Sequence, residues 1–296
     1  MRKTRKSKLK GQKQILLVGL FVFVTLMTIG YAAFNTNITL HAKGNIKIKL
    51  VDITDNVVTS GDGLYEDEYE DGRYVYKGAN PNNYVKFNNE LWRIVAKEAD
   101  GTYKIVRNEI LEARAYDKVY TDTGLETGDS NWARPATLNI YLNGTYYNGL
   151  TSTAQSQIVS HNWGNGGIQA SNYNLAVQIT DENSRVWNGK VALLTVSEYL
   201  RANTNARCNT FGGNDDNYQT CHKTNWLVIE DYRWHTLSAL DDPNTFYDIY
   251  SISSDGSIGG GRYVYKNYGV RPSVYLKSSI KITGGTGTES DPYVIV

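Results

Sequence analysis

The sequence predicts a mixed α+β domain, rich in strands and loops and with two or three short helices, behind an N-terminal apolar segment. Apolar residues alternate with polar ones through much of 74–106, which is the period of β-strands. Helical spacing replaces that alternation in short stretches between 131 and 203. A stretch dominated by Asn, Asp, Gly, Ser and Thr fills 203–262, which is typical of functional or covalently pinned loops.

The N-terminal segment predicts export. Residues 1–14 hold seven of the 31 basic residues and none of the 30 acidic ones, and residues 15–34 carry no charge. A helix rising ~1.5 Å per residue over that apolar run crosses a bilayer core of ~30 Å. The basic residues keep the first segment in the cytosol and direct the rest to the cell surface or beyond it. The small residues around Ala32 and Ala33 predict cleavage by a signal peptidase. The alternative is an uncleaved anchor that keeps the protein on the membrane.

The rest of the chain is acidic. Removing the seven N-terminal cations leaves 24 basic and 30 acidic residues in 35–296. Because affinity for nucleic acid comes mainly from neutralising phosphates, we expect no nucleic-acid partner. Apolar residues fall on even positions between Ile38 and Leu50, so we expect residues 35–54 to form a strand, a hairpin or a stalk. Residues 55–72 are acidic and turn-rich, which favours a solvated linker over a cation site. We expect the globular domain to span 73–296.

Within that domain the strands come first. We expect strands at 74–76, 84–87, 91–95 and 103–106, separated by turns at 80–83, 88–89 and 100–101. Helical spacing follows in 131–143, with Pro135 near its start. Thr151 or Ser152 can cap a second helix that ends near 159, and Ser197 can cap a third. Residues 191–194 predict a buried strand.

Two cysteines lie in the loop-rich stretch. Cys208 and Cys221 are the only cysteines of the chain and are 13 positions apart. Outside the cell they can close a loop worth ~3 kcal/mol on the chain-entropy argument. The alternative is two free thiols. A zinc site is disfavoured, because only His222 is nearby and the paired cysteine spacing of such sites is absent.

The same region supplies candidate ligand-binding residues. An exposed aromatic ring gives a broad, rigid contact surface, and tyrosine adds a hydroxyl. The candidates are Trp226, Trp234, Tyr247, Tyr250 and Tyr263. The alternative is that both tryptophans belong to the core. None of the four histidines forms a metalloprotease motif, and no G-x-S-x-G elbow occurs. We therefore assign no catalytic residue, no metal and no cofactor.

Several segments carry a resemblance to a known family. They are YVYKGANPNNYVKFNNELWRIV (74–95), TLNIYLNGTYYNGL (137–150), VALLTVSEYL (191–200), NWL and WHTLS (225–238), YGVRPSVYLKS (268–278) and GTGTESDPYVI (285–295). Together they resemble exported proteins of Gram-positive-type bacteria that carry a domain of uncharacterised function. That domain is similar in pattern to the formylglycine-generating-enzyme (sulfatase-modifying) branch of the C-type-lectin fold.

The resemblance implies a lectin-like fold over most of 73–296. It also implies structural roles in a closing strand: Gly269 permits close backbone approach, Arg271 bonds inward and Pro272 follows. The alternative is a plain strand ended by Pro272. The oxidase activity does not carry over, because Cys208 and Cys221 match no reactive cysteine motif.

Three functions compete on this sequence. The first is an exported surface protein for binding or adhesion, with a glycan or a protein as its ligand. The second is a structural subunit of an extracellular fibre or envelope layer. The third is a secreted enzyme of unknown reaction, which convergent polar groups in one deep pocket would favour.

Overall fold

The computed structural model describes residues 20, 21, 23, 24, 50–120, 126–127, 130–169, 174–208, 220–241 and 248–296. The chain divides into two units, Met1–Lys47 and Ile48–Val296. In the first unit, Leu20, Phe21, Phe23 and Val24 are helical. Among the described residues, no helix combines the length and the apolar character that a membrane span needs. The remainder of 1–34, including Ala32 and Ala33, lies outside the described residues, as does 35–49 of the expected hairpin or stalk.

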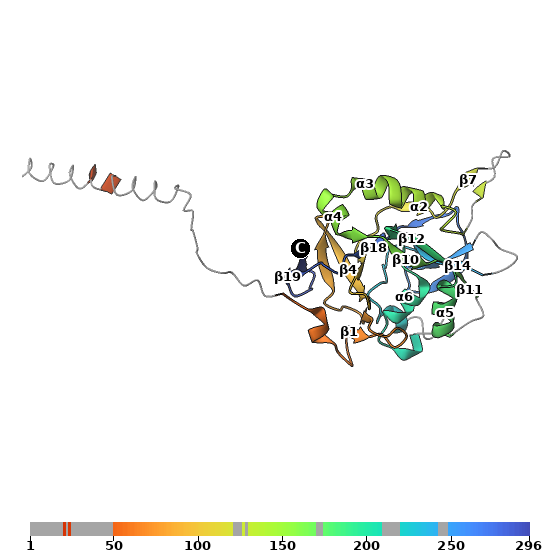
Figure 1. Ribbon diagram of the computed structural model, residues 1–296, viewed down its shortest axis with the longest axis horizontal. Coiled ribbons are helices and arrows are strands. Elements are labelled where there is room, and N and C mark those ends of the chain that lie inside the picture. Colours follow the sequence, from red (N-terminus) through yellow and green to blue (C-terminus); the bar gives the residue numbers. More distant parts are fainter. Residues whose placement is uncertain are drawn as a thin grey trace, which may run out of the picture. The chain divides into compact units, whose positions relative to one another are not determined.

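The second unit is a mixed α+β domain rich in strands (Figure 1), as the sequence predicted. Its larger sheet runs β13-β18-β5-β4-β3-β20-β19, with β1, β2 and β9 attached to it. The strands of this sheet are β1 (Gly63–Glu66), β2 (Tyr74–Lys77), β3 (Tyr84–Phe87), β4 (Glu90–Lys97), β5 (Tyr103–Arg107), β9 (Ile158–Val159), β13 (Val191–Ala192), β18 (Ser273–Leu276), β19 (Ile282–Gly284) and β20 (Tyr293–Ile295). Its pairs are antiparallel except β20 with β3.

A second sheet runs β16-β15-β14-β17-β6, with β11 beside β14. Its strands are β6 (Ala113–Ala115), β11 (Gly167–Ile168), β14 (Trp234–Leu240), β15 (Asp248–Ile252), β16 (Ile258–Tyr263) and β17 (Asn267–Gly269). Two ribbons complete the β-structure, β10 (His161–Gly164) with β12 (Val186–Gly189), and β7 (Val119–Tyr120) with β8 (Glu126–Thr127). Three strands therefore cross the stretch that the sequence predicted to be loop-rich.

The helices are short. They are the 3₁₀ turns η1 (Ile53–Asn56) and η3 (Ala206–Cys208), the π-turn η2 (Leu142–Tyr146), and α2 (Thr137–Tyr141), α3 (Tyr147–Gly149), α4 (Ser152–Gln157), α5 (Leu175–Glu182) and α6 (Val196–Arg201). Figure 1 shows α2, α3 and α4 together on one side of this unit. The first predicted helix begins only at Thr137, after Pro135, and the predicted cap Thr151 accepts a hydrogen bond from Ala154 N.

The predicted cap of the third helix is wrong. Ser197 lies inside α6, and Thr195 caps the helix instead. The Thr195 side chain accepts the Glu198 backbone N–H, and the Glu198 carboxylate accepts the Thr195 N–H at 2.9 Å. This reciprocal capping box satisfies two otherwise unpaired donors, which a serine two residues further along cannot do.

The first predicted hairpins are confirmed. β3 and β4 are joined at Asn88 and Asn89, whose φ angles of 52° and 61° suit the tight turns that Asn tolerates best. Gly101, with φ 83°, turns β4 into β5. The strands carry their apolar residues into one large core cluster that also receives Leu237 and Ile249 from the second sheet. Shared burial of this kind joins the two sheets.

The prediction that residues 55–72 form a solvated linker is wrong. Part of 55–72 forms β1, which pairs antiparallel with β2, and Leu64 of β1 is in the core. Asp67 is almost completely buried in ion pairs. A linker in water cannot keep such pairs, so this segment belongs to the folded domain.

Candidate functional site

The expected aromatic ligand-binding residues are mostly interior. Trp226, Trp234 and Tyr250 are buried. Trp226 donates its indole N–H to Tyr76 O at 2.9 Å, as buried tryptophans usually do. These three rings are therefore withdrawn from the expected recognition surface, and the alternative that both tryptophans are core residues fits their burial.

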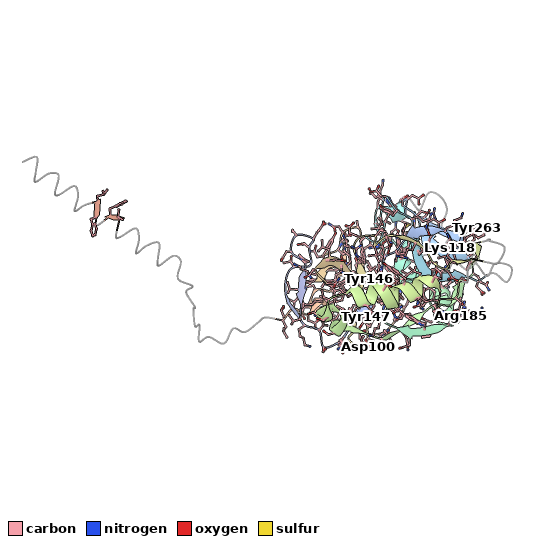
Figure 2. All side chains as sticks on the ribbon, turned by 90° about the horizontal axis from the view of Figure 1, so that it is seen from above. Asp100, Lys118, Tyr146, Tyr147, Arg185 and Tyr263 are labelled. Atoms are coloured by element: carbon pink, nitrogen blue, oxygen red, sulfur yellow. A yellow bond between two sulfur atoms is a disulfide. The ribbon has the colours of Figure 1, made fainter. Side chains whose placement is uncertain are left out.

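Of the other two candidates, Tyr247 lies outside the described residues, and Tyr263 is 52% exposed. Tyr263 stacks on Tyr265 with 5.1 Å between ring centroids and 10° between planes. Figure 2 shows Tyr263 at the edge of the domain. A ligand role for Tyr263 stays a prediction.

The segment 269–273 connects the two sheets. Gly269 ends β17 in one sheet and Ser273 begins β18 in the other. A Cβ on Gly269 would lie 2.8 Å from Ile110 Cδ1 and 3.2 Å from Arg233 O, so a side chain there needs a neighbour to move. Pro272, just before Ser273, accepts the Arg107 N–H with its carbonyl at 2.9 Å.

Arg271 is buried in this connection. It donates to Leu227 O at 2.8 Å and to Arg107 O at 3.3 Å, and its guanidinium lies 5.2 Å from the Trp234 ring centroid. Burial, with the charge of Arg93 next in size, lowers its pKa to about 9. Its neighbours are carbonyls and a ring, so the side chain holds the sheet connection together.

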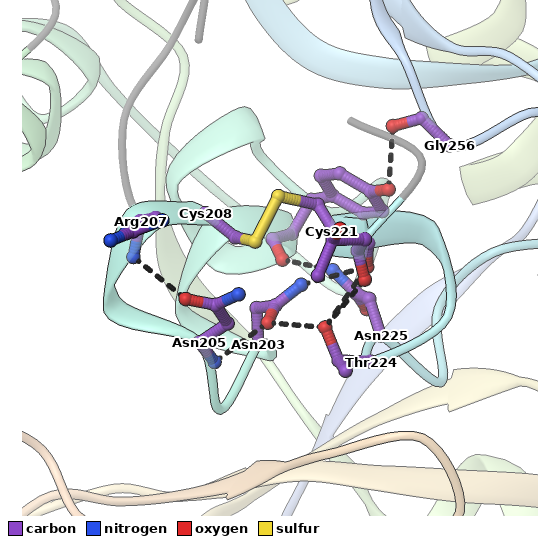
Figure 3. Close-up of a disulfide and its surroundings, with 10 residues drawn as sticks. Asn203, Asn205, Arg207, Cys208, Cys221, Thr224, Asn225 and Gly256 are labelled. Atoms are coloured by element: carbon purple, nitrogen blue, oxygen red, sulfur yellow. Dashed lines mark hydrogen bonds between the residues drawn. A yellow bond between two sulfur atoms is a disulfide. The ribbon is translucent and has the colours of Figure 1, made fainter. Parts of the chain in front are cut away.

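The predicted disulfide is confirmed. Cys208 and Cys221 are bonded, with 5.4 Å between their Cα atoms (Figure 3). Asn203 donates to Cys221 O at 2.8 Å, and Thr224 donates to Asn203 Oδ1 at 2.8 Å. The bond and these contacts hold Cys208 and Cys221 close to the end of α6.

A cluster of buried ion pairs lies beside α6 and around the loop between β1 and β2. Arg73 reaches Asp67 at 2.5 Å and Glu98 at 2.8 Å. Arg201, the last residue of α6, reaches the same Asp67 oxygen and Glu70, both at 2.7 Å. Burial raises the pKa of Asp67, but the guanidinium charges of Arg201 and Arg73 outweigh burial and hold that pKa below its usual value.

Lys104 and Glu198 extend this cluster inward. Lys104 Nζ lies 2.5 Å from Glu198 Oε1, and 4.5 and 4.9 Å from the ring centroids of Trp163 and Tyr275. Arg73 is 3.6 Å from the same carboxylate oxygen. Burial raises the pKa of Glu198, but the charges of Lys104 and Arg73, with hydrogen bonds, lower it overall. Glu198 is therefore held ionised while its other oxygen caps α6.

A second buried carboxyl group behaves in the opposite way. Glu182, at the end of α5, accepts hydrogen bonds from Ser197 N at 3.1 Å, from Ser197 Oγ and from Ser238 Oγ at 2.5 Å. Burial raises its pKa, and these hydrogen bonds offset only part of the rise. The two buried acids near α6 therefore differ: the pKa of Glu198 is lowered and the pKa of Glu182 is raised.

These side chains surround a cavity of about 130 Å³. Its lining consists of Glu70, Arg73, Glu98, Lys104, His161, Asn162, Gly164, Glu182, Asn183, Thr195, Ser197, Glu198, Arg201 and Tyr275. We call this the charged pocket. Four separate parts of the chain build it: the β1–β5 region, β10, the α5–α6 region and β18.

The rim of the charged pocket carries an imidazole and two amides. His161 stacks on Tyr275 with 3.8 Å between centroids, and its Nε2 lies 3.3 Å from Asp100 Oδ2. Asp100 lies at the periphery of the domain in Figure 2. Asn162 and Asn183 are exposed at the rim. Such groups can hydrogen-bond a polar molecule that enters.

The lining contains unused hydrogen-bonding capacity. Among the described residues, Arg201 Nε and Glu98 Oε1 are buried and have no partner. Buried polar atoms are completed in most proteins by another group or by water. Groups of three or more His, Cys, Asp or Glu that could hold a metal ion are not found in the described ranges.

Sequence reasoning missed the charged pocket. One of its acids, Glu70, lies in the segment that was predicted to be a solvated linker. The others were assigned no role, because no sequence motif links them to one another. The signal that was present is the capping-box pattern Thr195-x-x-Glu198, which places a carboxylate at the start of a buried helix.

The fold and this pocket define a strand-rich α+β domain with a buried ionic cluster open to solvent at one rim. Residues 100–278 match the family described as a domain of unknown function, DUF6273, and the chain belongs to this family. No curated protein and no solved structure matches the chain.

Proposed function

We propose that this protein is exported to the cell surface, where it binds glycans through the charged pocket. The basic segment 1–14 and the uncharged segment 15–34 support export. The disulfide also supports it, because such bonds persist in oxidising compartments. Fractionation of the native host tests this step. A full-length chain found in the cytosol with reduced thiols contradicts export.

We also propose that the domain is a distant member of the C-type-lectin fold, in its sulfatase-modifying branch. Support comes from the short helices, the strand-rich sheets and the connection 269–273 between them. An experimental structure compared with that fold tests the assignment. A different strand order in the larger sheet contradicts it.

The observation that carries the binding proposal is the convergence of polar groups on one cavity. Carboxylates, guanidinium groups, amides and an imidazole from four parts of the chain line it. Ligand sites use a few well-placed polar groups held by a rigid scaffold. The ion pairs supply that rigidity, because they fix the lining side chains before a ligand arrives.

A glycan array with the full-length protein in a mild detergent tests this proposal. Asn183→Trp places a large ring at the rim of the charged pocket, and we expect it to remove binding. Asn148→Trp adds the same ring to an exposed position of α3 that does not line the pocket, and we expect no loss. The proposal fails if no glycan binds, or if both variants bind like the parent protein.

One observation favours an enzyme as the second candidate. Glu198 and Glu182 line the same pocket with pKa values moved in opposite directions, which is the pairing that acid–base chemistry on a sugar requires. Incubating bound glycans with the protein and analysing the products by mass spectrometry tests it. Unchanged glycans after a long incubation rule out hydrolysis.

A further inference from the structure

The charged pocket carries information about its ligand. We propose that it takes one neutral, hydroxyl-rich sugar residue and discriminates against sugars that carry a carboxylate, phosphate or sulfate. This inference rests on the proposed glycan-binding function and names the ligand class of the same site.

The first step is that every cation of the pocket is already used. The side chains of Arg73, Lys104 and Arg201 are only 3%, 4% and 6% exposed, and each lies within 2.8 Å of a carboxylate oxygen. An anionic ligand would therefore share a cation that an internal carboxylate already neutralises, or displace that carboxylate and leave it buried without a partner, which is costly.

The second step is that the charge facing solvent is negative. Glu70 is 40% exposed, although it pairs with Arg201. The three cations are matched by four carboxyl groups: Asp67, Glu70, Glu98 and Glu198. The cluster therefore has one negative charge more than it has positive charges, and Glu182 is not included in this count. Asp100 adds a further carboxyl group beside His161 at the rim. An incoming anion therefore meets like charge in the partly dry mouth of a pocket, where repulsion is stronger than in water.

The third step concerns the unused atoms. Arg201 Nε is a donor and Glu98 Oε1 is an acceptor, and both lack partners in the described part of the chain. A hydroxyl group both donates and accepts, so the hydroxyls of a polyol or an ordered water can complete either atom. An ammonium group donates only, so it can complete Glu98 Oε1 and not Arg201 Nε. The amides of Asn162 and Asn183 also combine donor and acceptor.

The fourth step is size. The cavity of about 130 Å³ is smaller than the roughly 300–1,000 Å³ of pockets that enclose drug-sized ligands. A whole hexose is larger than this cavity, so part of one sugar residue enters and the remainder lies at the rim. A longer glycan would enter by its terminal residue, with the rest outside the rim.

Matched pairs of sugars test the inference. Glucose and glucuronic acid differ only at C6, as do galactose and galacturonic acid, so each pair isolates one carboxylate. We expect the full-length protein in detergent to bind the neutral member of a pair at least about tenfold more tightly, measured by saturation-transfer NMR and calorimetry. The preference should shrink in 1 M salt, where the Debye length is about 3 Å.

A variant separates charge from shape. Glu70→Gln keeps the size of the exposed carboxyl residue and removes its charge, so it should narrow the preference severalfold. Glu66→Gln is the matched control, because Glu66 is exposed on β1 and does not line the pocket. It should leave the preference unchanged.

The possible results are distinct. Equal or tighter binding of the uronic acid overturns this inference and leaves glycan binding intact. An unaltered preference in Glu70→Gln also overturns it, because the exposed charge would then play no part. No binding of any of the four sugars overturns both the inference and the proposed function.

Discussion

Removing one charge from the buried pair is the sharpest test of the ionic cluster. Glu198→Gln keeps the size of the side chain, and glutamine also serves in a capping box, so α6 keeps its cap. What changes is Lys104, which loses an anion 2.5 Å away while it stays enclosed by Trp163 and Tyr275. Breaking a buried pair from one side costs about 3–5 kcal/mol. Arg73 keeps Asp67 and Glu98, so we expect the lower end, about 3 kcal/mol.

Urea unfolding at pH 7, followed by tryptophan fluorescence, measures this cost. Glu68→Gln is the matched control, since Glu68 pairs with Lys77 at 3.1 Å but is 66% exposed, and exposed pairs contribute at most about 1 kcal/mol. The folded-state pKa of Glu198 is lowered, so its contribution is complete above the ordinary pKa of 4.5 and declines as pH falls through the folded value. The difference between parent and variant should therefore narrow below pH 4.5. Equal losses in the two variants would refute the reasoning.

Three further predictions follow from single features. Burial lowers the pKa of His235 from 6.5 to about 4, so stability should fall by about 3 kcal/mol as pH drops between these values; His235→Gln should lose that slope in pH-dependent urea titrations. Replacing Cys208 and Cys221 by serine should lower the free energy of unfolding by about 3 kcal/mol in the same assay. An unchanged free energy of unfolding would show that the disulfide does not stabilise the fold. Gly269→Ala should cost about 1–3 kcal/mol from overpacking, whereas Gly284→Ala, with open space around it, should cost less; the reverse order contradicts the packing.

The strands that the sequence predicted share one property. In 84–107 the alternation of apolar and polar residues and the turn residues Asn88, Asn89 and Gly101 agree, and the structure has these hairpins. Local chemistry and tertiary packing point the same way in this part of the chain. Prediction from pattern succeeds under that condition.

The strands in 203–262 were not predicted, because polar residues are buried in them beside the apolar ones. Thr236 and Ser238 of β14 are fully buried, and their hydroxyls bond Tyr250 O and Glu182. A strand whose interior face carries hydroxyls has the composition of a loop. Only the tertiary structure, which supplies the partners, shows that these polar groups can be inside.

The charged pocket could not be predicted from the sequence for a related reason. Asp67 and Arg201 are 134 positions apart in the chain, and Lys104 and Glu198 are 94 apart. No local period brings such residues together. An acidic residue in a turn-rich segment is usually solvated. The ion pairs that make Asp67 an exception form only when α6 packs against the β1–β2 loop.

The ion pairs that stabilise this domain also limit what its pocket can bind. Arg201 Nη1 is shared by Asp67 and Glu70 at 2.7 Å each, so a ligand carboxylate can reach that nitrogen only by replacing one of them. Such an exchange forms one ion pair and breaks another, so it gains no ion pair. It also leaves an unpaired acid in a buried lining, which is costly. A neutral hydroxyl adds no negative charge, and it can both donate and accept hydrogen bonds, whereas a carboxylate only accepts them. The preference for neutral ligands is therefore a consequence of how the fold pairs its own charges, and it should persist in any variant that keeps those pairs.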